Sequence, residues 1–198
     1  VQIGSTTLAG WTLDSQSSLS VGLKAYWKMD EASGTRSDQI GTSNLIEVYD
    51  NVASITGIRG QAGSYVFGQS DGLYHTSPSN SAFSVSNGNI SVSAYVYLDT
   101  IGVSQNIVSK WDDSPNDFEY RIQISAANSA TFAVVNAAGT STVLSANSFG
   151  ALNTSSWFNI VGWHSDGSHI GVSVNLSATT SPWTTGVRTG TAQFIVGI

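Results

Sequence analysis

The sequence predicts an all-β protein folded as a two-sheet antiparallel β-sandwich, or jelly roll. Apolar residues alternate with polar ones in short blocks, as they do in half-buried strands. Gly, Asn, Asp and Ser separate these blocks, and such residues are typical of tight turns. No segment shows a 3.6-residue period over three turns, so the pattern gives no indication of a helix. Many short strands without a helix favour a sandwich or a jelly roll.

Residues 1–20 are mostly small and polar, and we interpret them as an extended N-terminal arm or linker ahead of one domain over residues 21–198. The alternation predicts strands over residues 23–29, 64–67, 90–98, 106–110, 118–124, 131–135, 157–163, 170–174 and 193–198. The Asp166-Gly167 pair lies between two of these strands and predicts a tight hairpin. No turn or polar tail follows the strand at 193–198, so we expect it to leave a sheet edge open.

The composition narrows the function classes. The 198 residues carry 7 basic and 13 acidic side chains, and the resulting net charge of −6 argues against nucleic acid as a partner. No apolar run is long enough to span a membrane. The absence of Cys removes disulfides, thiolate metal sites and cysteine nucleophiles. Only 10% of the residues are charged, and this weakly charged composition favours an extracellular, cell-surface or virion location.

Several blocks follow one another in an order that points to a known family. They are residues 23–31 followed by Gly34 and Asp38, the spacing Gly57-x-x-Gly60-x-x-Gly63 before residues 65–67, and residues 90–98, 106–110, 157–161, 172–175 and 194–197. Together they resemble the laminin G-like domains, which are concanavalin A-like jelly rolls related to pentraxins. The resemblance implies a lectin-like sandwich over roughly residues 21–198. Family members usually add a further block after the last one, beside the first strand, and this sequence lacks it.

The segment between the strands at 106–110 and 118–124 is a candidate calcium site. Asp112, Asp113, Asn116 and Asp117 place four oxygen-bearing side chains within six residues, and Ca²⁺ prefers oxygen ligands. The spacing is not that of an EF-hand. The alternative is a turn that these residues cap. The resemblance to pentraxin-like domains also implies acidic calcium-binding loops.

A polar row on one strand is the candidate glycan site. Glu119, Arg121 and Gln123 are spaced by two, so they project from one face of the strand. We expect Tyr95 and Tyr97 to join this row, because planar polar groups beside aromatic rings suit a sugar. The alternative is an ordinary solvent-facing side of a sheet.

The tryptophans divide into two groups. Trp111 and Trp183 lie in expected loops, and we favour them as residues that stack on a ligand. Trp27, Trp157 and Trp163 lie in expected strands and are predicted to pack in the core. A sugar is therefore expected to contact Trp111 together with Glu119 and Arg121.

The sequence indicates a binding module rather than an enzyme. Of the three Glu residues, no two flank an Asp on one strand, which is the arrangement that glucanases of this fold use. We expect a non-catalytic module that binds glycans, with Ca²⁺ held by the acidic loop. The alternative is a structural subunit of a surface assembly, such as a phage fibre or a capsid decoration. There, a second copy or a neighbouring chain would complete the open sheet edge.

Overall fold

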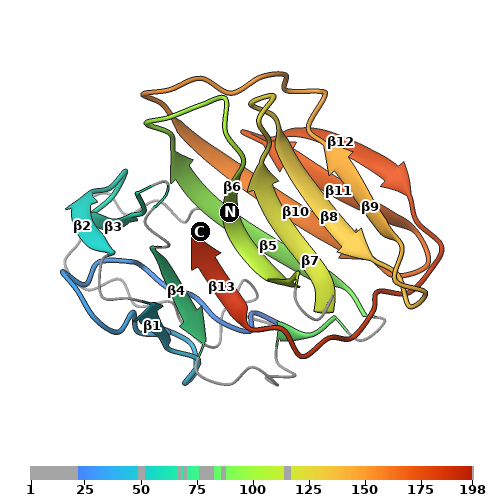
Figure 1. Cartoon of the computed structure of the whole chain (residues 1–198), viewed down its shortest axis with the longest axis horizontal. Coiled ribbons are helices and arrows are strands. Elements are labelled where there is room, and N and C mark those ends of the chain that lie inside the picture. The colour runs from blue at the N-terminus through green and yellow to red at the C-terminus, as the bar shows by residue number, and fades with distance from the viewer. Residues whose placement is uncertain are drawn as a thin grey trace.

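A computed structural model describes residues 22–48, 52–66, 68, 71–75, 83–85, 88–113 and 117–197. The predicted N-terminal arm lies outside these residues. The regular elements in the described part are all strands: β1 (Leu45–Val48), β2 (Ala53–Thr56), β3 (Gln61–Ser64), β4 (Gly72–His75), β5 (Ile90–Tyr97), β6 (Gln105–Asp112), β7 (Asp117–Ile124), β8 (Ala130–Val135), β9 (Ser141–Ser145), β10 (Trp157–Ser165), β11 (His169–Val174), β12 (Ser177–Pro182) and β13 (Phe194–Gly197) (Figure 1). The prediction of an all-β protein is confirmed.

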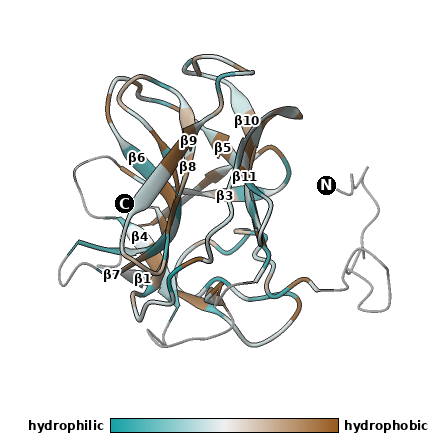
Figure 2. Ribbon diagram, turned by 90° about the vertical axis from the view of Figure 1, so that its right-hand side faces the viewer, coloured by the Kyte–Doolittle hydropathy of each residue, from teal (hydrophilic) through white to brown (hydrophobic). Residues whose placement is uncertain are grey.

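The strands form two packed antiparallel sheets. The large sheet has seven strands in the order β1-β4-β13-β6-β7-β8-β9, and the small sheet has four in the order β12-β11-β10-β5. The hairpin β2-β3 stands apart from both sheets (Figure 1). Seen from the side, β6, β8 and β9 form one layer, and β5, β10 and β11 form the other (Figure 2). The predicted two-sheet β-sandwich is therefore the observed architecture.

The core lies between the two sheets. On β10 every second residue is buried, and Ile160 has no exposed surface. Opposite it, β7 and β8 contribute Ile122 and Phe132, a cross-strand pair that is also fully buried. Gly162 on β10 allows the sheets to approach closely, because a Cβ added there would lie 2.5 Å from Cδ2 of Phe132. Burying each large apolar side chain in this layer contributes about 1.5–3 kcal/mol of transfer free energy.

The last described strand lies inside the large sheet rather than at its edge. On one side β13 pairs with β4, where Ile195 opposes Tyr74. On the other side it pairs with β6, where Ile195 opposes Ser109. The expectation that the strand at 193–198 leaves an open edge is therefore wrong. This also removes one observation behind the alternative of a subunit completed by a neighbouring chain.

The structure confirms the hairpin that Asp166-Gly167 predicts. It joins β10 to β11, with Ser165 paired to His169. The predicted strand at 23–29 is wrong, because Trp27 makes only an isolated bridge to Asp38 and Met29 has a left-handed φ of 62°. Of the strand predicted at 64–67, Ser64 is the last residue of β3, and residue 67 lies outside the described residues. The strands that the sequence did not indicate are β1, β2, β4, β9 and β12.

Candidate functional site

The outer side of the small sheet carries an unusual number of aromatic rings. Burial alternates strictly along β5 and β10, so one set of side chains faces the core and the other faces outward. The outward set on these two strands, here called the aromatic face, comprises Ser91, Ser93, Tyr95, Tyr97, Trp157, Asn159, Val161, Trp163 and Ser165. Tyr95 and Tyr97 are each 38% exposed. Apolar rings and short polar groups thus lie together on one surface.

Trp163 is held flat against the sheet by the residue beside it. On β11 its cross-strand partner is Gly171. A Cβ added to Gly171 would overlap with Cζ2 and Cε2 of the Trp163 ring and lie 2.6 Å from Cη2, so the indole occupies the space that a side chain would fill. His169 meets the same indole edge-on, with ring centroids 6.4 Å apart. These contacts fix the orientation of a large, partly exposed aromatic ring.

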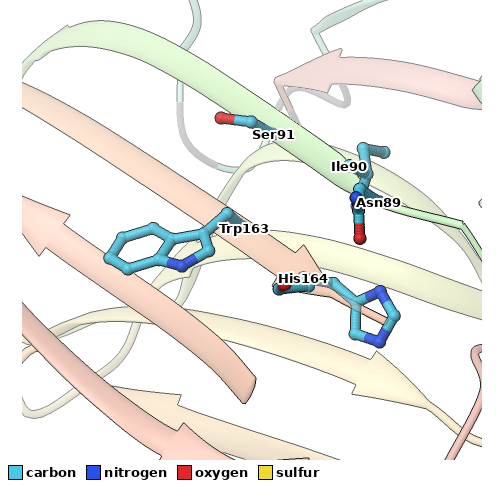
Figure 3. A pocket seen from close by; sticks show the side chains of 6 residues that line it. Asn89, Ile90, Ser91, Trp163 and His164 are labelled. Carbon is cyan, nitrogen blue, oxygen red and sulfur yellow. The ribbon is translucent and has the colours of Figure 1, made fainter. Parts of the chain in front are cut away.

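A hollow of about 440 Å³ lies next to this indole and is lined by Asn89, Ile90, Ser91, Trp163, His164 and Ser165. Figure 3 shows the Trp163 indole and the His164 imidazole, neighbours on β10, extending in opposite directions among the lining residues. Asn89 is fixed, because its Oδ1 accepts a hydrogen bond of 2.8 Å from the backbone N–H of Asp166. The hollow therefore combines one apolar wall with hydroxyl and amide groups.

His164 belongs to the core rather than to the surface. Its side chain is 1% exposed, its Nδ1 lies 2.9 Å from the carbonyl oxygen of Gly88, and its ring meets Trp183 edge-on. Trp183 itself is 6% exposed and packs in the core. Trp183 lies outside the strands, directly after β12, as expected, but the expectation that it stacks on a ligand is wrong.

A second aromatic group occupies the other end of the aromatic face. Tyr97 pairs with Trp157 across β5 and β10, and their ring centroids are 5.5 Å apart. Next to them, Asn159 Nδ2 donates a hydrogen bond of 3.3 Å to Ser93 Oγ. Trp157 and Trp163 are six residues apart on one strand, a separation of about 20 Å. The face thus presents aromatic rings at both ends and polar groups between them.

The structure does not bring all of the predicted glycan residues together. Tyr95 and Tyr97 lie on β5 in the small sheet, whereas Arg121 and Gln123 lie on β7 in the large sheet. The expectation that the tyrosines join the polar row is therefore wrong. Trp157 and Trp163, which were expected to pack in the core, instead lie on the aromatic face beside those tyrosines.

Glu119 is an internal residue and has no free oxygen to offer a sugar. It has no exposed surface, and its Oε1 lies 3.2 Å from Nζ of the equally buried Lys110. Ser84 Oγ and the backbone N–H groups of Val85 and Gly190 also donate hydrogen bonds to this carboxylate. The prediction that Glu119 contacts a glycan is therefore wrong, because its carboxylate neutralises and positions Lys110.

The predicted calcium ligands lie at the β6-β7 hairpin, with Asn116 outside the described residues. Asp112 and Asp113 are exposed, and Asp113 Oδ1 accepts a hydrogen bond of 3.1 Å from Trp111 Nε1. Asp117 is 8% exposed, and its Oδ2 accepts two hydrogen bonds of 2.6 Å from Thr191. Residues 22–48, 52–66, 68, 71–75, 83–85, 88–113 and 117–197 contain no cluster of three or more His, Asp or Glu that could hold a metal. Calcium binding stays a prediction.

Competing effects set the pKa of Asp117. Burial of the carboxyl by itself raises the pKa. The hydrogen bonds from Thr191, together with the positive charges of Lys110 and Arg188, outweigh that effect and hold the pKa below its ordinary value. The carboxylate therefore anchors the segment around Thr191 to the start of β7.

The three Glu residues all have structural contacts. Glu47 Oε1 lies 3.0 Å from Nη2 of the buried Arg36, and Glu31 Oε1 accepts a hydrogen bond from the Ser37 N–H. Glu119 pairs with Lys110 as described above. Asp38 also has a structural role, because its carboxylate accepts hydrogen bonds from the backbone N–H groups of Tyr26, Ile40 and Ser43. No helix in the described part of the chain is long and apolar enough to cross a membrane.

Several solved structures share the β-sandwich fold of this chain. The chain is similar to the binding domain of Paraclostridial Mosquitocidal Protein 1, with a TM-score of 0.66 and 13% identity over 81% of this chain and 41% of that one. It is also similar to the receptor binding domain of botulinum neurotoxin D, with a TM-score of 0.62 and 10% identity over 86% and 45% of the two chains. The chain thus spans less than half of the length of either toxin domain.

A third similar structure matches this chain over most of the length of both chains. It is Domain 4 of AbnA, a GH43 extracellular arabinanase from Geobacillus stearothermophilus, in complex with arabinotriose, with a TM-score of 0.58, 17% identity and 85% of both chains covered. Family models and curated protein sequences show no match. The likenesses show the β-sandwich and are not specific to laminin G-like domains.

Proposed function

We propose that this protein is a non-catalytic, extracellular carbohydrate-binding module that holds a glycan on the aromatic face of the small sheet. The observation that carries the proposal is the Trp163 indole, held flat by Gly171 beside a hollow lined by Ser91, Asn89 and Ser165. An oriented ring offers its face to the C–H groups of a sugar, and neighbouring hydroxyls and amides can bond to sugar hydroxyls.

Preorganisation strengthens the proposal. The Gly171 backbone and the His169 ring restrict the Trp163 indole before any ligand arrives. A ligand therefore loses little affinity to the entropy of ordering that side chain. The rest of the aromatic face is also built from strands rather than from loops, which keeps its rings in register.

The similar structures support this proposal. One similar domain was solved in complex with arabinotriose, and it matches this chain over 85% of both lengths. Two others are described as binding or receptor binding domains of toxins. The arabinanase that contains the first domain is described as extracellular, and the weakly charged composition of this chain suits the same location.

A glycan array tests the proposal with the wild-type protein, a Trp163→Ala variant and a Val143→Ala control. Val143 is 53% exposed on β9 of the large sheet, so its loss removes a surface side chain away from the aromatic face. We expect wild type and Val143→Ala to bind the same glycans, and Trp163→Ala to lose that binding while its Tm stays within a few degrees. If the wild type binds no glycan on the array, or if Trp163→Ala binds as the wild type does, the proposal is refuted.

A further inference from the structure

Arg121 on β7 is stacked on an aromatic ring at the outer side of the large sheet. Its Cζ lies 4.2 Å from the centroid of the Trp111 ring. That indole is itself fixed, because its Nε1 donates a hydrogen bond to Asp113 Oδ1 and its ring lies 4.6 Å from the Phe118 ring. The guanidinium is therefore held in a defined plane by an ordered support.

The donors of this guanidinium are unused by the described part of the chain. The two ion pairs there are Arg36–Glu47 and Lys110–Glu119, and no side-chain hydrogen bond involves Arg121. Arg36 shows the contrast: it bonds to Glu47 and to the carbonyl oxygens of Gly34 and Val52. Burial lowers the pKa of Arg121 while the nearby Asp113 opposes that change, and arginine keeps its charge in proteins. A half-buried cation with unoccupied donors is suited to binding an anion.

Further polar groups lie beside it on the same strands. Two residues along β7, Gln123 Nε2 donates a hydrogen bond of 3.2 Å to Asn106 Oδ1 on β6. This bond orients both amides and leaves the Asn106 amide N–H groups and the Gln123 carbonyl for a ligand. The cross-strand partners of Arg121 are Ser109 and Ala133, and both have short side chains.

We infer that Arg121, Gln123 and Asn106 form a second ligand site, separate from the aromatic face, that takes the carboxylate of an acidic sugar. The planar guanidinium fork matches a carboxylate through two parallel hydrogen bonds, and the amides suit the ring hydroxyls. The net charge of −6 disfavours a polyanion such as nucleic acid or a densely sulfated chain. A single carboxylate on a sugar ring fits both the local cation and the overall charge.

The two sites can be tested separately because they lie on different sheets. The probes are oligosaccharides of galacturonic acid, glucuronic acid and sialic acid, each beside its methyl ester, which keeps the shape and removes the charge. Calorimetric titration uses wild type, Arg121→Gln, Arg121→Lys and Trp163→Ala. Arg121→Lys keeps the positive charge and loses the planar fork, so it remains informative if Arg121→Gln lowers the Tm.

We expect at least one acidic oligosaccharide to bind the wild type at least tenfold more tightly than its methyl ester. Arg121→Gln and Arg121→Lys should each weaken that binding about tenfold or more, and Trp163→Ala should leave it unchanged. Equal affinity for the acid and the ester, or no binding of any acidic probe, would overturn the inference. Acid binding that survives in both Arg121 variants and is lost in Trp163→Ala would overturn it as well, while supporting the aromatic face.

Discussion

The indole of Trp163 occupies the space above Gly171 that any other residue would fill with its side chain. Gly171 has a buried position on β11 and pairs with Trp163 across the hairpin that Asp166-Gly167 closes. The orientation of the principal aromatic ring is thus determined by the smallest residue on the neighbouring strand.

Gly171→Ala should displace this ring without unfolding the sandwich. The added methyl overlaps with the indole, so the ring must leave the sheet surface. We expect glycan affinity to fall about tenfold, because the ring then loses its preorganised position. The free energy of unfolding should change by less than about 1 kcal/mol, since the new methyl lies on the outer side of the sheet. Calorimetric titration and urea unfolding measure the two quantities.

Gly162→Ala is the matched control on the inner side of the same sheet. There the methyl would lie 2.5 Å from Cδ2 of Phe132, in the core. Overpacking of this kind costs about 1–3 kcal/mol. We expect this variant to lose stability and to keep its glycan affinity. If both glycine variants lose affinity to the same extent, the Trp163 orientation is not the determinant.

Glu119→Gln should destabilise the protein strongly. It removes the charge that neutralises Lys110, and both side chains are at most 1% exposed. Breaking a buried ion pair on one side costs about 3–5 kcal/mol. Asp113→Asn, an exposed acidic position on the same hairpin, should change stability by less than about 0.5 kcal/mol. Urea denaturation checks both values, and a loss of less than about 1 kcal/mol for Glu119→Gln would contradict the internal role assigned to this residue.

Asp117 should make the protein sensitive to acid. Its pKa is lower in the folded state than its ordinary value of about 3.9, so the unfolded chain binds a proton more readily. The stability that it contributes is complete above about pH 4 and is lost as the pH falls through the lower folded pKa. Asp117→Asn keeps an oxygen for Thr191 and removes the titration. We expect the Tm of this variant to fall less steeply than that of the wild type below pH 4, and parallel curves would contradict the prediction.

Calcium binding by the β6-β7 loop can be tested independently of glycans. If Asp112 is a ligand, as the sequence predicts, millimolar Ca²⁺ should raise the Tm of the wild type and leave that of Asp112→Ala unchanged. Because the loop belongs to the large sheet, we expect EDTA to leave binding at the aromatic face unaffected. A wild-type Tm that does not respond to Ca²⁺, with no heat on titration, would reject the site.

The sequence was sufficient for the architecture because strand alternation and turn residues are local signals. The strand at 170–174 and the Asp166-Gly167 hairpin illustrate this. The same alternation misled at residues 23–29, where the backbone N–H of Tyr26 bonds to the Asp38 side chain instead of to a neighbouring strand. The spacing of residues 23–29 gives no information on this competing acceptor, because Asp38 lies in a later turn.

The site was harder to predict because strand position alone does not tell which residues face outward. On β10 the inward set mixes Phe158 and Ile160 with Gly162 and His164. The outward set mixes two tryptophans with Asn159, so hydrophobicity alone does not show that the tryptophans face outward. The strand register counted from the Asp166-Gly167 turn places Trp163 opposite Gly171. That pairing is a signal that the indole lies over a residue without a side chain. No comparable signal shows that Glu119 is buried, since Gly190 and Ser84 cover it from distant segments.

The position of β13 also determines when the large sheet can be completed during translation. It is made after the other described strands, yet it alone connects the β1-β4 pair to β6 in the large sheet. Until it emerges from the ribosome, β4 and β6 each have one edge without its final partner. The large sheet is therefore completed late and through contacts distant in sequence, which is the kind of topology that folds slowly. Rapid insertion of β13 therefore protects the edges of β4 and β6 from pairing with other chains.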